Sequence, residues 1–310
     1  MSRILVTGAA GFIGSYLTDQ LLADGHEVIG MDNRVSGQMK NLDDAFKHDC
    51  FSFYEHDVTD FIHISGELDA VLHLASLASP IFYQEHPIKT LKVGAMGTHK
   101  TLGLAKEKDA TYLFTSTSEV YGDPEVNPQP ESYRGNVDPY GPRSCYDESK
   151  RYGEALVRGY RDKHNLDVRV ARIFNTYGPR MRLDDGRVIP NFITQALNGD
   201  ELTVYGDGTQ TRSFCYVSDL IKGLVALLES NVDEPVNIGK PDERTINELA
   251  ELVLDVTGSK SRIVHEELPP QDPQVRQPDI SIARRELSWE PEVRLREGLE
   301  RSLSYFENQM

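Results

Sequence analysis

The chain has 310 residues, of which 39% are hydrophobic and 26% charged, as in a soluble globular protein of one large domain or two. A formal net charge of −16 without any basic run argues against nucleic-acid binding. The three cysteines form no C-x-x-C pair and no apolar run has the length of a membrane span, which argues against a disulfide scaffold, a zinc finger and a membrane protein and predicts a cytoplasmic one.

The first predicted unit is a strand, a glycine-rich turn and a helix. The apolar run Ile4–Val6 leads into Thr7-Gly-Ala-Ala-Gly-Phe-Ile-Gly14, and an amphipathic stretch follows from Tyr16 to Ala23. Glycines at this spacing allow a tight turn, close approach of the backbone to a pyrophosphate, and close packing of a helix on a strand. The unit predicts a dinucleotide site at Gly8, Gly11 and Gly14; a glycine turn without a ligand is the alternative.

The next predicted strand, Val28–Met31, ends at Asp32. In a dinucleotide-binding unit, an acid at this place accepts hydrogen bonds from the adenosine ribose hydroxyls. A carboxylate would repel the 2′-phosphate of NADP, so Asp32 favours NAD. Arg34 lies close enough in the sequence to keep NADP as an alternative.

Buried-strand patterns continue at regular spacing, with helical stretches between most of them. They cover Phe51–Tyr54, Ala70–Ala75, Tyr112–Ser116 and Val168–Phe174. The alternation predicts an α/β fold of the Rossmann type, with a doubly wound parallel sheet that binds ligands beyond the carboxyl ends of its strands. The nine histidines show neither H-x-H nor H-E-x-x-H spacing, so we expect no metal site.

The strand that ends near Thr115 continues into Ser116-Thr-Ser-Glu-Val-Tyr-Gly122. In the predicted sheet, Thr117, Ser118 and Glu119 would lie at the mouth of the cofactor site. Two hydroxyls and a carboxylate at that place could take part in proton transfer beside a hydride acceptor. An exposed loop carboxylate and two hydroxyls that cap a turn are the alternative.

Tyr146 and Lys150 are four residues apart, so they lie on one face of a helix. Ser144, with Asp147 three residues later, predicts a capping box that would place Tyr146 in the first helical turn. There the lysine cation and the helix dipole would lower a tyrosine pKa that starts near 10, and the phenol could act as a general base or acid. Judged by spacing alone, a chance pair on a solvated helix face is the commoner case.

After Pro179 the alternation of strands and helices weakens. Helical patterns cover residues 188–197, 217–228, 246–257 and 295–306, and short strand patterns cover 202–205 and 235–238. The segment 217–238 is interpreted as a return to the sheet. We therefore expect a cofactor domain of residues 1–176 plus about 216–240, and a smaller, discontinuous substrate-binding lobe of about 177–215 plus 241–310.

Longer strings give the chain a specific resemblance. The motifs Gly8-x-x-Gly11-x-x-Gly14 and Tyr146-x-x-x-Lys150, with Arg172-Ile-Phe-Asn-Thr-Tyr-Gly-Pro-Arg180, resemble the extended short-chain dehydrogenase/reductase family that modifies nucleotide sugars, the NAD-dependent epimerases and dehydratases. Within it the chain most resembles the UDP-glucuronate decarboxylases, or UDP-xylose synthases, from about Arg3 to Phe306. The most specific strings are Ser116–Pro124, Gly141–Arg151, Asp185–Val188, Tyr205–Phe214 and Asp272–Asp279.

The resemblance implies decarboxylation of UDP-glucuronate to UDP-xylose through a UDP-4-keto sugar, with NAD recycled rather than consumed. Tyr146 would exchange a proton with the C4 oxygen, beside Lys150, and Thr117 or Ser118 would hydrogen-bond the same oxygen. Glu119 and Arg276 would lie at the reacting carboxylate, where a permanently charged guanidinium is a suitable clamp.

The resemblance also implies two sets of binding residues, one for each end of the site. The expected NAD-binding residues are Gly8, Gly11, Phe12, Ile13, Gly14, Asp32, Asn33, Asp57, Val58, Leu74, Ala75, Ser76, Thr115, Tyr146, Lys150 and Ile173. The expected residues for the UDP-sugar are Asn175, Arg187, Val188, Asn191, Tyr205, Arg212 and Arg276. Arginines suit the diphosphate because they offer bidentate donors; a surface ion pair is the alternative for any one of them.

Two helical stretches, Thr90–Lys106 and Asp147–His164, flank the predicted sheet. In relatives such helices pair with their counterparts in a second subunit, so the resemblance implies a homodimer. The first stretch departs from the family, because Gly94 stands where the family usually has an asparagine that supports the catalytic helix. Ser149, beside the catalytic pair, is interpreted as harmless variation.

Three other functions remain as alternatives. A nucleotide-sugar 4-epimerase needs only oxidation, rotation of the sugar and reduction, and Glu119 with the string Asp272–Asp279 argues against it. A 4,6-dehydratase is expected to carry an Asp-Glu pair after the threonine, where this chain has Ser118. A non-catalytic nucleotide-sugar-binding protein would need neither Tyr146 nor Lys150.

Overall fold

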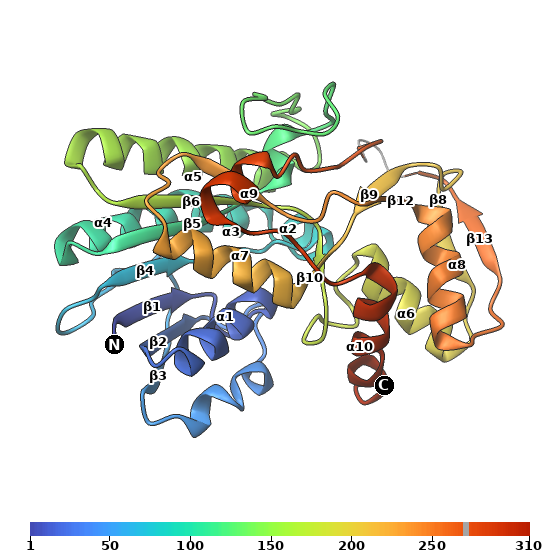
Figure 1. Cartoon of the computed structure of the whole chain (residues 1–310), viewed down its shortest axis with the longest axis horizontal. Helices are drawn as coiled ribbons and strands as arrows, with labels where there is room; N and C mark the ends of the chain where they lie inside the picture. Colours follow the sequence, from blue (N-terminus) through green and yellow to red (C-terminus); the bar gives the residue numbers. More distant parts are fainter. Residues whose placement is uncertain (269–272) are drawn as a thin grey trace.

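The computed structural model describes residues 1–268 and 273–310, and its centre is a seven-stranded parallel sheet (Figure 1). The strand order is β11-β6-β5-β4-β1-β2-β3. The strands are β1 (Arg3–Thr7), β2 (Glu27–Asp32), β3 (Phe51–Glu55), β4 (Ala70–His73), β5 (Thr111–Thr117), β6 (Val168–Ile173) and β11 (Pro235–Ile238). The order reverses between β1 and β4, so the predicted doubly wound sheet of the Rossmann type is confirmed.

Alternating side chains of the central strands enter two separate cores. In β1, Ile4 and Val6 pack into the core shared with helices α1 (Phe12–Ala23) and α7 (Val217–Glu229), while Leu5 packs into the opposite one. The opposite core is shared with α4 (Thr98–Lys108) and α5 (Ser144–His164). A strand covered by helices on both faces has no solvent-exposed face that would carry polar side chains. This explains the near-continuous apolar runs of the sequence.

The start of α5 corrects one prediction. The N-cap of α5 is Arg143, and no side chain caps the helix. Ser144 is already the first helical residue, so its backbone cannot adopt the extended N-cap conformation that a capping box needs. Tyr146 lies in the first turn, as expected. Among the described residues no helix is long and apolar enough to span a membrane.

The helical stretch before α5 is longer and less regular than expected. It consists of α3 (Pro87–Lys92), a π-helical turn η3 (Val93–Gly97) and α4, which continue one another from 87 to 108. A short helix, α2 (Pro80–Glu85), precedes them. The π turn contains Gly94, and the whole run packs along α5.

Most of the second half forms a separate group of elements on the right of Figure 1. Helices α6 (Val188–Asn198) and α8 (Ile246–Thr257) pack against strand β8 (Leu202–Tyr205), which pairs in parallel with β13 (Ile263–Glu266). Helix α10 (Leu295–Glu307) packs against α6 and α8. The remaining short pairs are β7 (Thr176–Tyr177) with β10 (Cys215–Tyr216) and β9 (Thr211–Ser213) with β12 (Glu243–Thr245). Bounds of α8 and β8 agree with the sequence patterns.

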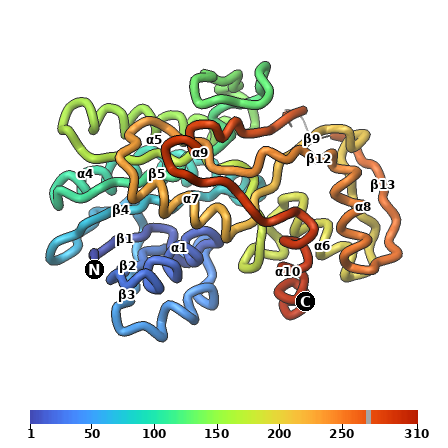
Figure 2. Tube along the Cα trace, in the orientation of Figure 1, coloured from blue at the N-terminus to red at the C-terminus, as the bar shows by residue number. Residues whose placement is uncertain are grey.

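One part of the segment assigned to the lobe lies on the sheet instead. Helix α9 (Ser281–Leu287) packs against β11 and α7, and the tube in Figure 2 runs from the lobe to α9 and back to α10. Trp289 fixes this return, because its indole Nε1 donates a hydrogen bond to the Asp219 carbonyl of α7 at 3.0 Å.

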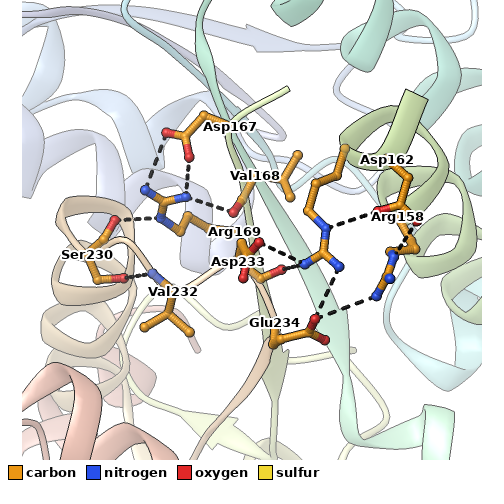
Figure 3. Close-up of polar contacts among 10 residues, drawn as sticks. Arg158, Asp162, Asp167, Val168, Arg169, Ser230, Val232, Asp233 and Glu234 are labelled. Carbon is orange, nitrogen blue, oxygen red and sulfur yellow. Dashed lines mark hydrogen bonds and ion pairs between the residues drawn. The ribbon is translucent and has the colours of Figure 1, made fainter. Parts of the chain in front are cut away.

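The edge strand β11 is attached by arginines from neighbouring elements (Figure 3). Arg169 of β6 donates from Nε to the Ser230 carbonyl at 2.7 Å and from Nη1 to Asp167 at 2.5 Å. Arg161 of α5 donates to the Asp233 carbonyl at 2.6 Å and to Glu234 at 3.1 Å. The loop before β11 is therefore held at both β6 and α5, which keeps this end of the sheet in register.

Candidate active site

A cavity of about 600 Å³ lies at the carboxyl ends of the sheet strands and reaches into the lobe. All six expected catalytic residues and all seven expected substrate-binding residues line it. So do the expected cofactor-binding residues except Asp57. The structure thus brings together segments that are up to about 270 residues apart in sequence, from Gly8 to Arg276. Asp272, the first residue of the string Asp272–Asp279, lies outside the described residues.

The glycine loop between β1 and α1 has no room for side chains. Gly8 has a φ of +72°, and a Cβ there would lie 2.8 Å from the Ala75 backbone nitrogen. A Cβ on Gly14 would overlap the Gly8 carbonyl. Because these glycines let the chain turn back on itself, the N-terminus of α1 lies open to the cavity with Gly11 as its N-cap. Such an end suits a pyrophosphate.

We expect Gly8→Ala to abolish NAD binding, whereas Gly25→Ala should leave it intact. Gly25 is a matched control, since its φ is +84° and a Cβ at this position would have no atom within 4 Å. Both variants carry the left-handed backbone strain of about 1 kcal/mol, but only Gly8→Ala adds a clash with the loop that faces the cofactor. Calorimetric titration with NAD and a thermal melt measure the two effects separately. Equal NAD affinity in both variants would contradict the assignment of the loop.

Asp32 has the environment expected of a ribose acceptor. Its carboxylate accepts hydrogen bonds from the Ala10 nitrogen at 3.1 Å and the Arg34 nitrogen at 2.7 Å. Burial raises the pKa of Asp32, and these two backbone bonds counteract the rise. The guanidinium of Arg34 points to Glu55, at 2.6 Å, which gives it a partner other than a 2′-phosphate. This arrangement favours NAD over NADP.

Asp57 does not line the cavity, but it contacts Asn33, which does. Its carboxylate accepts hydrogen bonds from Asn33 Nδ2 at 2.8 Å and from the backbone nitrogen and hydroxyl of Thr59. Burial raises the pKa of Asp57, but these bonds and the nearby Lys89 outweigh it and bring the pKa to about 2. A permanently ionised Asp57 therefore orients Asn33, which does line the cavity.

Tyr146 and Lys150 both face the cavity and are buried, with 6% and 5% of their surface exposed. The Lys150 ammonium donates to the Thr115 carbonyl at 2.8 Å and lies 5.9 Å from the centre of the Tyr146 ring. On another side, the ring of Tyr83 stacks on the ring of Tyr146, with the ring centres 5.3 Å apart. The pair is held from several sides, as a proton-transfer group must be.

The predicted lowering of the Tyr146 pKa is wrong. Burial raises the pKa of Tyr146, and a hydrogen bond with Thr117 lowers it less than burial raises it. Burial also lowers the pKa of Lys150 to about 8. Spacing on a helix gave the correct neighbours, but burial shifts the pKa of each group toward its neutral form.

Glu119 lies between two arginines at the end of the cavity next to Tyr146. One carboxylate oxygen contacts Arg276 Nη1 and the other accepts from Arg143 Nη2 at 2.6 Å. Arg276 is 3% exposed and also donates to the Gly122 carbonyl at 3.0 Å. Burial would raise the pKa of Glu119, but the two guanidiniums hold it well below its usual range. The site therefore has a fixed carboxylate with two cations around it.

The lobe contributes the remaining polar residues. Arg187 is the N-cap of α6 and forms a two-point ion pair with Asp185, with Nη2 to Oδ2 at 2.7 Å. Arg212 is buried in β9 and donates to the Thr211 carbonyl at 2.8 Å. Tyr205 ends β8 and is 42% exposed. A ring and two guanidiniums on separate elements can contact a nucleotide from different sides.

Sequence reasoning missed several residues of this site. Arg143 belongs to the specific string Gly141–Arg151, yet nothing in its spacing indicates a contact with Glu119. Tyr83 gives no signal, because its stacking on Tyr146 depends on where α2 lies. Asp147 looked like a cap, but it is 6% exposed, and burial together with the Glu119 charge raises its pKa.

The chain belongs to the NAD dependent epimerase/dehydratase family, whose pattern it matches over residues 4–239. Its cofactor is NAD. Among curated proteins it is 52% identical over 308 residues to UDP-glucuronic acid decarboxylase 1 of Xenopus tropicalis, covering 99% of this chain and 73% of the relative. It is 54% identical over 298 residues to UDP-glucuronic acid decarboxylase 3 of Arabidopsis thaliana, covering 96% and 86%.

Solved structures of other family members have the same fold. The UDP-glucose 4-epimerase of Thermotoga maritima, with UDP-glucose, has a TM-score of 0.90 and 30% identity, covering 99% of both chains. A UDP-glucuronic acid 4-epimerase from Bacillus cereus, in complex with UDP-glucuronic acid and NAD, has a TM-score of 0.87 and 29% identity, covering 99% of this chain and 100% of the other. The chain is thus much more similar in sequence to the decarboxylases than to these epimerases.

Proposed function

We propose that this protein is an NAD-dependent UDP-glucuronate decarboxylase that forms UDP-xylose. The observation that carries the proposal is the pairing, in one cavity, of a buried Tyr146–Lys150 couple with Glu119 held between two arginines. Identity of 52–54% to decarboxylases over nearly the whole chain supports it. The first half with residues 216–240 would hold NAD, and the remaining residues the UDP-sugar.

The first step is proton removal from the sugar C4 hydroxyl. Ionised Tyr146, the tyrosinate, is the group that can accept this proton, since its side chain faces the cavity and hydrogen-bonds to Thr117. Lys150 provides a positive charge near the phenol and is fixed by the Thr115 carbonyl. When bound, NAD supplies the acceptor for the C4 hydride, and its positive nicotinamide ring also favours the tyrosinate over the buried phenol.

The second step is loss of CO2 from the resulting 4-keto sugar. A C5 carboxylate β to the C4 ketone leaves readily, because its electron pair becomes an enolate. The protonated Tyr146 can donate to that enolate oxygen. Arg276 and Arg143 would bind the carboxylate, and Glu119 keeps both guanidiniums in place. A proton from water would enter at C5, and return of the hydride to C4, with the Tyr146 proton returned to the C4 oxygen, would complete UDP-xylose.

A 4-epimerase acting on the same substrate is the second candidate, because a structural neighbour of that activity binds UDP-glucuronic acid and NAD. The two activities differ in whether CO2 is released from the sugar. Incubation with UDP-glucuronate and NAD should give UDP-xylose by NMR and one CO2 per product. UDP-galacturonate without CO2 would establish the epimerase, and a 4-keto-6-deoxy product from UDP-glucose would establish the 4,6-dehydratase.

The proposed enzyme is a homodimer that pairs through the α3–η3–α4 run and α5. This surface exposes large apolar side chains, namely Ile88 (65%), Leu91 (40%), Met96 (45%) and Tyr152 (50%). Apolar side chains gathered on one face are typical of a subunit interface. A cytoplasmic location is part of the proposal and rests on Cys50, Cys145 and Cys215, which are all unpaired.

We expect Leu91→Glu/Met96→Glu to convert the dimer into monomers, because both charges would be buried at the interface. Native mass spectrometry and light scattering measure the change directly. Ile81→Glu is the control, since Ile81 is similarly exposed (48%) but lies on α2. A wild-type chain that is monomeric at micromolar concentration would contradict the proposed dimer.

A further inference from the structure

The π turn η3 lies against α5 at the point between Tyr146 and Lys150. Helices α3 and α4 meet there, and Gly94 is the second residue of the turn. A π turn widens a helix locally and is frequent at functional sites. The run from α3 to α4 is therefore irregular at the place where it supports the catalytic helix.

The contact of Gly94 with Ser149 leaves no room for a side chain at position 94. A Cβ on Gly94 would lie 2.8 Å from Ser149 Oγ and 3.1 Å from its Cα, and closer still to its Cβ. These atoms are fixed parts of the α5 backbone and its first side-chain atoms, so α5 itself would have to move. Ser149 is 3% exposed, and its hydroxyl donates to the Tyr146 carbonyl at 2.7 Å.

We propose that Gly94 and Ser149 are a matched pair of positioning residues that sets the distance of α5 from the η3 turn, and through it the positions of Tyr146 and Lys150. Ser149 is thus part of the support of the site rather than neutral variation. An asparagine at position 94 would require a smaller residue at 149. The two positions must change together, since either change alone leaves an overlap or a gap beside the catalytic pair.

The test is a double-mutant cycle of Gly94→Ala, Ser149→Gly and both together, with Ser149→Ala added. Gly103→Ala is the control, because Gly103 lies in α4 and no atom is within 4 Å of a Cβ there. The readouts are kcat and KM for UDP-glucuronate, the pH profile of kcat, the Kd for NAD, and Tm.

We expect Gly94→Ala to lower kcat by about tenfold or more, since small displacements of a catalytic group can cost up to 10²-fold, with KM and the NAD Kd within about twofold of wild type. Ser149→Gly in the same chain should restore kcat to within about twofold, because it removes the overlapping Cβ. Ser149→Ala should not restore it, because alanine keeps that Cβ. Gly103→Ala should leave kcat unchanged.

A double variant no more active than Gly94→Ala would overturn the proposal. So would a Gly94→Ala variant that loses Tm but keeps kcat and its pH profile, because that result describes packing alone. If Gly94→Ala does not fold, the double variant must fold and retain kcat; failure of the double variant refutes the pair. The proposal relies on the proposed function for its assay, so wild-type turnover is identified first. A wild-type product other than UDP-xylose refutes the function alone, and the cycle is then scored on that product.

Discussion

Tyr146→Phe is expected to lower kcat for UDP-xylose formation by about 10³-fold or more, because it removes the group proposed to exchange a proton with the C4 oxygen. General acid–base catalysis contributes about 10²–10⁴-fold. Phenylalanine keeps the ring that stacks on Tyr83. The Kd for NAD and Tm should therefore stay close to wild type. Stopped assays of CO2 and UDP-xylose measure the loss.

Tyr152→Phe is the matched control for this prediction. Tyr152 lies on the same helix but is 50% exposed and does not line the cavity. Tyr152→Phe should retain kcat. Since each variant removes one phenol hydroxyl from α5, a loss of kcat in Tyr146→Phe alone is specific to the position of Tyr146. Full turnover by Tyr146→Phe would show that another group exchanges the C4 proton and would remove Tyr146 from the mechanism.

The sheet could be predicted from the sequence because burial on both faces leaves a strong local signal. The apolar runs at Ile4–Val6 and Val28–Met31 differ from β1 and β2 by only one residue at each end. The short pair β9–β12 could not be predicted in the same way. Three-residue strands carry too little periodicity, and their pairing joins Thr211 to Thr245, far apart in the sequence.

The site was predictable as a set of positions but not as a set of interactions. Topology places strand ends at one edge, so Thr117, Glu119 and Asn175 meet there for reasons that the sequence shows. The pKa values and ion pairs of the site depend instead on how deeply each side chain is buried. Burial reverses the expected pKa shift of Tyr146, and the partner of Glu119 on one side, Arg143, belongs to the turn just before α5. Neither fact can be read from residue spacing.

Arg276→Ala is expected to lower kcat/KM for UDP-glucuronate by about 10²–10⁴-fold, because removing one partner of a buried charged contact costs about 3–5 kcal/mol. The NAD Kd should stay within about twofold. The reason is position: Arg276 contacts Glu119 and Gly122, at the cavity end next to Tyr146 and away from the glycine loop. If Arg276 acts on the carboxylate after C4 oxidation, the absorbance of reduced cofactor should build up in single turnover without matching release of CO2.

Two companion variants decide what Arg276 does. Arg244→Ala, an exposed arginine on β12, should keep wild-type kinetics and so controls for loss of positive charge in the lobe. Arg276→Lys keeps the positive charge beside Glu119. A lysine ammonium lacks the two guanidinium nitrogens with which Arg276 contacts Glu119 and the Gly122 carbonyl at the same time. It should therefore keep Tm near wild type and still lose about tenfold or more in kcat, as a clamp with fixed geometry requires. An unchanged kcat and KM in Arg276→Ala would instead mean that Arg276 only neutralises Glu119, and the carboxylate clamp would then have to be Arg143 alone.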